Sequence, residues 1–283
     1  MNVEKELTFF LECKDYTVSK DKFKLLYDAE YDMLITVPKP SENDLGKYYE
    51  SEDYISHTDA KRSIFEKLYH SVKTYAIRKK VELLYSLDQK TGDLLDIGAG
   101  TGDFLSKAKS KGWNVTGIEP NESARELAKQ KSVFLKDTTK NIPDESFDII
   151  TMWHVLEHVP NVKEQIRELK RLLKPNGYVI IAVPNFKSYD ANYYKSFWAA
   201  YDVPRHLTHF SKASIQKLFN EKNLALQKVL PMRFDSYYVA LLSEKYKTNN
   251  MNFLKAFCVG FFSNIKGRAT GEYSSHIYVL KNH

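Results

Sequence analysis

Apolar residues in the middle of the chain follow two different spacings. From Lys61 to about Ser86 they recur every three or four residues, which predicts a helix with one apolar face. Short apolar runs then alternate with amphipathic helical stretches, a pattern that predicts a parallel, doubly wound α/β sheet. The predicted strands are 94–97, 115–119, 133–135, 148–153 and 178–183.

Two further strands, 224–230 and 276–280, are predicted near the end of the chain, with a helical insertion of about 235–271 between them. Within the insertion, 253–265 is apolar but contains Lys255 and is too short for a bilayer span, which takes about 20 apolar residues. We expect a buried helix here. A helix that contacts a membrane surface or a second copy of the chain is the alternative.

The N-terminal region has a different pattern. Residues 1–60 show no sustained helical or strand period, and Pro38 and Pro40 interrupt them. We expect a cap or lid over a catalytic domain formed by 61–283. The segment 48–57 is rich in tyrosine and is placed to close over a ligand and exclude water, with Tyr54 contacting the substrate.

The charge, the cysteines and the first residues of the chain limit the kinds of partner, metal site and location to be expected. The net charge of +6 is spread along the 283 residues, which indicates a solvated surface and argues against a nucleic-acid partner. Cys13 and Cys258 are far apart and have no metal-ligand spacing, so we expect two reduced thiols. The first residues lack the apolar core of a signal peptide, and we expect a cytoplasmic protein.

A glycine-rich segment follows the strand 94–97 and opens a helix. Glycines at 98, 100 and 102 allow a sharp turn and a close approach to a ligand, and Glu119 on the next strand can accept hydrogen bonds from ribose hydroxyls. A dinucleotide motif reads GxGxxG, whereas this chain has GxGxG with Asp103 in the last glycine's place, where a carboxylate repels a pyrophosphate. Asp96 is placed to meet an ammonium group, which S-adenosylmethionine has and NAD lacks.

With LLDIGAGTGDFL at 94–105, the segment from Gly92 to about Asn185 resembles the class I S-adenosylmethionine-dependent methyltransferases. The resemblance implies a Rossmann-like, doubly wound sheet of seven strands, mostly parallel with the last strand antiparallel. It also implies S-adenosylmethionine as cofactor. By the resemblance, the loop of Gly98, Ala99, Gly100, Thr101 and Gly102 wraps the methionine part, Glu119 takes the ribose, and Asp137 and Thr138 flank the adenine. We expect Asp96 and Pro120 to contact the cofactor as well.

The segments FDIITMWHVLEHVP at 147–160 and YDVPRHL at 201–207 resemble a subgroup similar to ubiquinone-biosynthesis O-methyltransferases. Because open α/β sheets bind ligands at the carboxyl ends of their strands, we expect the first segment to face the cofactor and the second to face the substrate. The expected cofactor contacts are Met152 and Trp153, the substrate contacts Asp202 and Arg205, and the catalytic candidates His206, His154 and His158. Many members of this subgroup carry N-terminal cysteine pairs resembling a zinc ribbon, but here only Cys13 stands in that region, and we predict no metal.

The leading hypothesis is a methyltransferase acting on a small molecule at a hydroxyl oxygen, with His206 or His154 as base. Carbon methylation of a nucleotide-linked sugar and a non-catalytic cofactor-binding or interaction subunit are the alternatives. One subclass of nucleic-acid methyltransferases, which methylates amino groups, carries an Asn/Asp-Pro-Pro-aromatic tetrapeptide after the fourth strand. This chain lacks that tetrapeptide. We expect a monomer or a homodimer, without a transmembrane segment but with a possible peripheral membrane contact.

Overall fold

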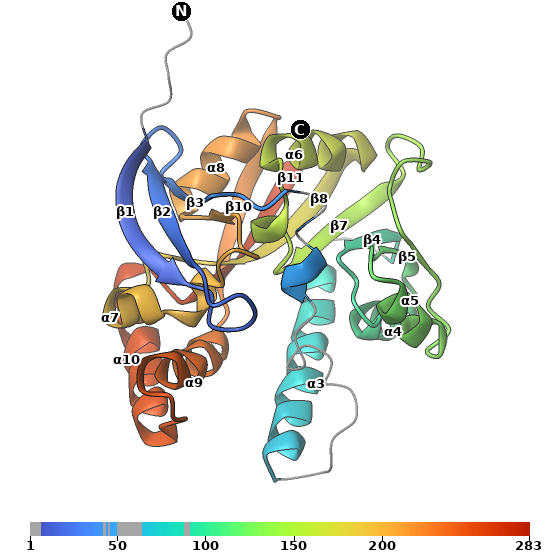
Figure 1. Ribbon diagram of the computed structural model, residues 1–283. Helices are drawn as coiled ribbons and strands as arrows, with labels where there is room; N and C mark the ends of the chain where they lie inside the picture. Colours follow the sequence, from blue (N-terminus) through green and yellow to red (C-terminus); the bar gives the residue numbers. More distant parts are fainter. Residues whose placement is uncertain (1–6, 42–43, 45, 50–63, 88–90) are drawn as a thin grey trace, which may run out of the picture.

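A seven-stranded sheet forms the centre of the molecule in the computed structural model, which describes residues 7–41, 44, 46–49, 64–87 and 91–283 (Figure 1). Its strand order is β10-β11-β8-β7-β4-β5-β6, and β11 runs antiparallel to both of its neighbours. This confirms the expected Rossmann-like sheet with an antiparallel last strand. The strands are β4 (Asp93–Ile97), β5 (Asn114–Ile118), β6 (Leu135–Lys136), β7 (Phe147–Trp153), β8 (Leu173–Pro184), β10 (Leu224–Pro231) and β11 (Ser275–Asn282).

Both faces of this sheet are buried, because successive residues of the central strands enter different cores. Leu95 and Ile150 belong to one hydrophobic cluster, whereas their neighbours Leu94 and Ile149 belong to another on the opposite face. This two-sided burial explains the continuous apolar runs of the sequence. The surrounding helices are α3 (Ile64–Tyr85), α4 (Asp103–Lys109), α5 (Glu122–Lys129), α6 (Val162–Leu172) and α8 (Lys212–Asn220).

The N-terminal region forms a second sheet, so the expectation of an irregular segment is wrong. β1 (Leu7–Lys14), β2 (Lys22–Asp28) and β3 (Met33–Val37) pair antiparallel, and β3 pairs with β9 (Thr208–His209). The pattern escaped detection because β1 has a register shift between Phe9 and Leu11, which breaks the alternation of apolar and polar residues. Pro38 follows β3 instead of interrupting it.

The predicted insertion between β10 and β11 folds as a helical hairpin of α9 (Asp235–Thr248) and α10 (Phe253–Thr270). These helices pack against each other and against α7 (Tyr189–Tyr194), and Figure 1 shows the three together beside the N-terminal sheet. The expectation that 253–265 is buried is wrong, since most of its large apolar side chains are exposed. Among the described residues, no helix has the length and apolar character needed to cross a bilayer.

Candidate active site

The glycine loop, Gly98–Gly102, joins β4 to α4 at the carboxyl edge of the sheet. Its three glycines have φ angles of +73°, +52° and +73°, a region that residues with a Cβ rarely adopt. A Cβ at Gly98 would overlap the side chain of Val155, whereas one at Gly100 would meet no atom within 4 Å. The backbone at Gly100 therefore borders open space, as a loop that approaches a ligand must.

Glu119 lies beside this loop, directly after β5. Its carboxylate accepts hydrogen bonds from the backbone N–H groups of Gly100 (2.8 Å) and Asn121 (3.0 Å). Pro120 next to it is exposed, and so are Asp137 and Thr138, which follow β6 at the same edge. The predicted ribose and adenine residues are thus brought to one edge of the sheet, close to the open side of the glycine loop.

Asp96 lies inside β4 and is 2% exposed. Burial raises the pKa of its carboxyl to about 7, although a hydrogen bond from Thr151 Oγ1 at 2.6 Å opposes the shift. Its negative charge also acts on Lys80 of α3, whose ammonium lies 4.4 Å from the centre of the Trp153 ring. Lys80 was missed by sequence reasoning, because a lysine pair on an amphipathic helix gives no signal of a site.

At the end of β7, the two residues predicted to face the cofactor, Met152 and Trp153, point to opposite faces of the sheet. The Met152 side chain is fully buried in a core cluster, so the prediction that it faces the cofactor is not supported by its position. Trp153 points to the opposite face, as alternation along a strand requires, and packs against Phe104 with ring centres 5.6 Å apart. Of these two residues, Trp153 is the one whose side chain lies next to Lys80.

His154 follows β7 and is held between two carboxylates. Its Nε2 lies 3.1 Å from Asp235 Oδ2 at the start of α9, and its Nδ1 lies 3.4 Å from Glu157 Oε1. Burial alone would lower the pKa of His154, but the bonds to Asp235 and Glu157 raise it to about 10. The side chain is therefore protonated at neutral pH, which argues against a role as general base.

Three further groups converge behind His154, and we call them the histidine cluster: Glu157, His158 and His206. One nitrogen of each ring and one carboxylate oxygen of Glu157 all lie within 4.8 Å of one another, and the two rings are 4.5 Å apart. Glu157, which is 1% exposed, forms the 3.4 Å ion pair with His154 through Oε1, but neither of its oxygens accepts a well-aligned hydrogen bond from a described residue. A buried carboxylate with so little hydrogen bonding is costly, so the cluster is suited to receive a proton, a hydroxyl donor or a cation.

Backbone carbonyls fix the tautomers of the two histidines. Nδ1 of His158 lies 3.1 Å from the Arg205 carbonyl oxygen, and Nδ1 of His206 lies 2.9 Å from that of Ala200. Because a carbonyl can only accept, each Nδ1 carries the proton and Nε2 keeps its lone pair in the neutral ring. Burial, followed by the charge of His206, lowers the pKa of His158 to about 4, so His158 is neutral at physiological pH.

An ion pair between Arg205 and Asp202 stabilises the loop that carries His206. Arg205 donates from Nε to Asp202 Oδ2 at 2.9 Å, forms a second bond to the same carboxylate, and donates to the Tyr48 carbonyl at 3.1 Å. Asp202 Oδ2 also lies 3.8 Å from His206 Nε2. Both predicted substrate residues thus brace the loop against the N-terminal region, while Tyr54 lies outside the described residues.

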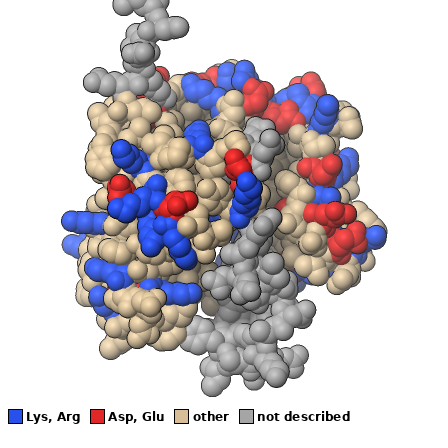
Figure 2. Space-filling model, viewed as in Figure 1, with Lys and Arg blue, Asp and Glu red and all other residues tan. Residues whose placement is uncertain are grey.

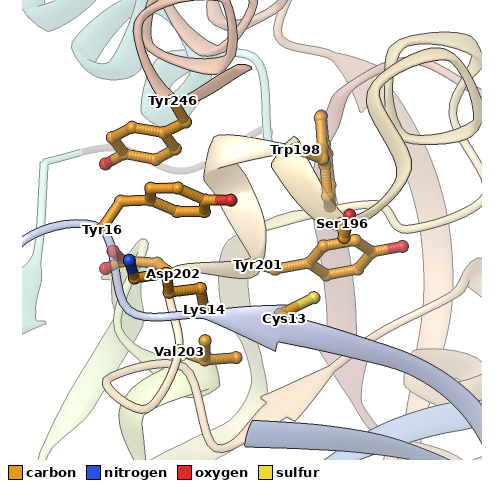
Figure 3. A pocket seen from close by; sticks show the side chains of 9 residues that line it. All are labelled: Cys13, Lys14, Tyr16, Ser196, Trp198, Tyr201, Asp202, Val203 and Tyr246. Atoms are coloured by element: carbon orange, nitrogen blue, oxygen red, sulfur yellow. The ribbon is translucent and has the colours of Figure 1, made fainter. Parts of the chain in front are cut away.

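A small cavity on the other side of Asp202 is lined by Cys13, Tyr16 and Tyr246 among others (Figure 3). The rings of Tyr16 and Tyr246 stack with centres 4.5 Å apart, and burial raises the pKa of the Cys13 thiol to about 12. The cavity has a volume of about 10 Å³, which is room for roughly one water molecule. It is too small to accept a substrate.

Comparisons with known proteins agree with this geometry. Residues 69–229 match the family described as "Methyltransferase domain". The chain is 28% identical over 200 residues to a ubiquinone biosynthesis O-methyltransferase of Rickettsia typhi, covering 64% of this chain and 80% of that protein. It is 33% identical over 124 residues to a demethylmenaquinone methyltransferase of Staphylococcus epidermidis, covering 38% of this chain and about half (52%) of the relative.

Solved structures show the same fold. The geranyl diphosphate C-methyltransferase of Streptomyces coelicolor A3(2) superposes with a TM-score of 0.56 at 15% identity, covering 80% of this chain and 88% of that one. The residues present here fit S-adenosylmethionine, because the open backbone at Gly100, the Glu119 carboxylate and the buried Asp96 lie at one edge of the sheet. The chain belongs to the methyltransferase-domain family and is a class I S-adenosylmethionine-dependent methyltransferase.

Proposed function

We propose that this chain methylates a hydroxyl oxygen of a small-molecule acceptor, with His206 as the general base. The observation that carries the proposal is the histidine cluster, in which two imidazole rings lie next to a buried carboxylate whose one charged partner is His154. Glu157 and His158 come shortly after β7, and Val155, just before them, packs against Gly98 of the glycine loop. The name of the Rickettsia typhi relative, an O-methyltransferase, supports oxygen as the acceptor atom.

The cofactor supplies an electrophilic methyl group on a positively charged sulfur. The chain's own residues have to position the acceptor and remove its proton. Nε2 of His206 would take the hydroxyl proton, so that the acceptor oxygen could bond to the methyl carbon that a bound donor supplies as its carbon–sulfur bond breaks. Asp202 at 3.8 Å and the buried Glu157 stabilise the imidazolium that forms.

In this proposal His154 positions the acceptor instead of accepting its proton. Its two N–H groups are taken by Asp235 and Glu157, so the charged ring acts on the acceptor through its position and its charge. We further propose that the enzyme works in the cytoplasm and without a resident metal. Chelator treatment should leave kcat unchanged; loss of activity that Mg²⁺ or Zn²⁺ restores would assign the histidine cluster to metal binding.

The acceptor atom can be tested directly. The purified protein is incubated with donor labelled with ¹³C at the methyl group and a panel of phenols, catechols and nucleotide-linked sugars. Carbon NMR separates methyl groups on oxygen from those on carbon. We expect O-methyl signals alone; C-methyl signals would assign the chain to carbon methylation, and failure to bind donor at millimolar concentration would contradict catalysis altogether.

A further inference from the structure

The outer face of α10 carries large apolar side chains, and its inner face carries small ones. Toward the protein, the helix presents Val259 and four smaller residues, Ala256, Gly260, Ser263 and Gly267, and a Cβ at Gly260 would press against Tyr237 of α9. The outward side chains are Phe253, Leu254, Phe257, Phe261, Phe262 and Ile265, which are 46–76% exposed. A helix that only covered a core would have the opposite arrangement.

This apolar face continues onto the neighbouring segments. Phe234 and Tyr238 of the α9 region and Met251 of the turn are also exposed. Nine of the sixteen exposed large hydrophobic side chains among the described residues thus lie in 234–265. Along α10 the group is contiguous, since Phe261 lies with its ring centre 6.2 Å from that of Phe257 and 6.0 Å from that of Phe262. Single exposed apolar residues are common, but a contiguous group of this kind marks an interaction site.

The charges around this face are of one sign. The charged residues of α10 are Lys255, Lys266 and Arg268, all basic. The two acidic residues of α9 point inward: Glu244 is fully buried and bonded to Tyr194, and Asp235 pairs with His154. Lys255 pairs with Glu244 at 3.3 Å, which leaves Lys266 and Arg268 as the basic residues that α10 offers to a partner. Over α9 and α10, Figure 2 shows basic side chains and no acidic ones on the visible face.

We propose that α10 docks the enzyme on a bilayer surface rich in anionic phospholipid, lying in the plane of the interface. Large apolar residues on one face of a helix with lysine and arginine beside them are typical of helices that insert into the headgroup region. A second copy of the chain fits less well, because a symmetric contact would bring Lys266 and Arg268 of one copy against the same basic face of the other.

The position of the hairpin connects this surface to the active site. Phe234 is half exposed at the start of α9, and the next residue, Asp235, pairs with His154. The Phe234 ring packs against Tyr75 of α3, which lines an open groove of about 420 Å³ together with Ser71, Thr74 and Arg78. Docking through α10 would therefore place this groove near the lipid surface.

Co-sedimentation with vesicles tests the proposal. The full chain is mixed with vesicles of phosphatidylcholine alone or of phosphatidylcholine with phosphatidylglycerol, and we expect binding to the second kind only. The double variant Leu254→Ser/Phe257→Ser should bind at least tenfold more weakly, whereas the control Phe9→Ser, on exposed β1, should bind normally. Circular dichroism and donor binding check that both variants are folded.

A second pair of variants tests the charge. Lys266→Gln should weaken binding about fivefold, since one basic residue near an anionic surface contributes about that factor, while exposed Lys228→Gln on β10 should have no effect. No binding to the anionic vesicles would overturn the proposal. So would equal binding to both vesicle types, or a dimer in light scattering that Leu254→Ser/Phe257→Ser converts to monomer.

Discussion

The glycine loop and the histidine cluster follow neighbouring strands, β4 and β7, but they differ in how their polar groups are satisfied. In the glycine loop, Gly98 and Ala99 donate to the Ile118 carbonyl, and Glu119 accepts from Gly100. In the histidine cluster, the buried Glu157 pairs with His154 but accepts no well-aligned hydrogen bond from a described residue, and the Nδ1 groups of His158 and His206 point to the backbone. The polar groups of the glycine loop are thus already hydrogen-bonded within the protein, whereas the histidine cluster can still bind a proton or a polar group of a ligand.

This difference indicates that donor binding and proton transfer depend on separate parts of the molecule. Residues near the glycine loop should change donor affinity, because they shape a surface that exists before any reaction. Residues of the histidine cluster should change kcat, because the buried carboxylate of Glu157 stabilises a proton that moves onto a neighbouring ring.

The largest expected effect comes from His206→Gln. Loss of a general base costs about 10²–10⁴-fold in rate, so kcat should fall by at least 100-fold while donor affinity stays unchanged. Steady-state kinetics and donor titration measure the two quantities. The deficit should shrink as pH rises, since hydroxide then ionises the acceptor.

His209→Gln is the matched control for this variant. His209 is also buried and bonds to Thr36 Oγ1 at 3.1 Å, but it lies outside the histidine cluster. We expect it to lower stability and to change kcat by only a few fold. Equal losses of kcat in both variants would mean that His206 supports the loop and does not accept the proton.

Gly98→Ala should have the next largest effect. A positive φ for a residue with a Cβ costs about 1–2 kcal/mol, and the overlap with Val155 adds about 1–3 kcal/mol. Donor binding should weaken and the free energy of unfolding should fall by about 2–5 kcal/mol. Denaturant unfolding measures the second quantity, and Gly46→Ala, where a Cβ meets no atom within 4 Å, should change neither.

Glu119→Gln should weaken donor binding about tenfold with little change in kcat. The amide keeps the shape of the side chain but replaces one charged acceptor, and a hydrogen bond to a charged group contributes about 1.5–3 kcal/mol, part of which the amide oxygen retains. Glu122→Gln, at the exposed start of α5, is the control. A fall in kcat without a change in affinity would break the proposed separation between the two regions.

The sequence predicted these two regions unequally well, for a physical reason. The central sheet and the glycine loop follow from local spacing, because a strand, a glycine turn and a helix are adjacent in the chain. The histidine cluster joins 157–158 with 206, and Asp235 reaches His154 from a helix about 80 residues later, so no local pattern reveals either contact. The N-terminal strands were missed because their alternation is broken at Phe9–Leu11.

The smallest predicted effect concerns the link between His154 and the hairpin. Asp235 and Glu157 hold the pKa of His154 at about 10, so its contribution to stability is fully present below its unfolded value of about 6.5 and is lost as pH rises toward 10. Asp235→Asn removes one of the two charges and should lower the pKa of His154 by about 1–3 units, as the loss of a close opposite charge does. Imidazole NMR signals report the shift.

The same variant should flatten the dependence of the unfolding free energy on pH between about 6.5 and 10. Asp144→Asn serves as control, because this exposed carboxylate pairs with Arg171 and lies far from any histidine contact in the described structure. If the pKa of His154 stays near 10 in Asp235→Asn, Glu157 alone holds the proton and the hairpin is not coupled to the site. If the pKa falls while kcat is unchanged, His154 does not position the acceptor, and the catalytic work rests with the histidine cluster.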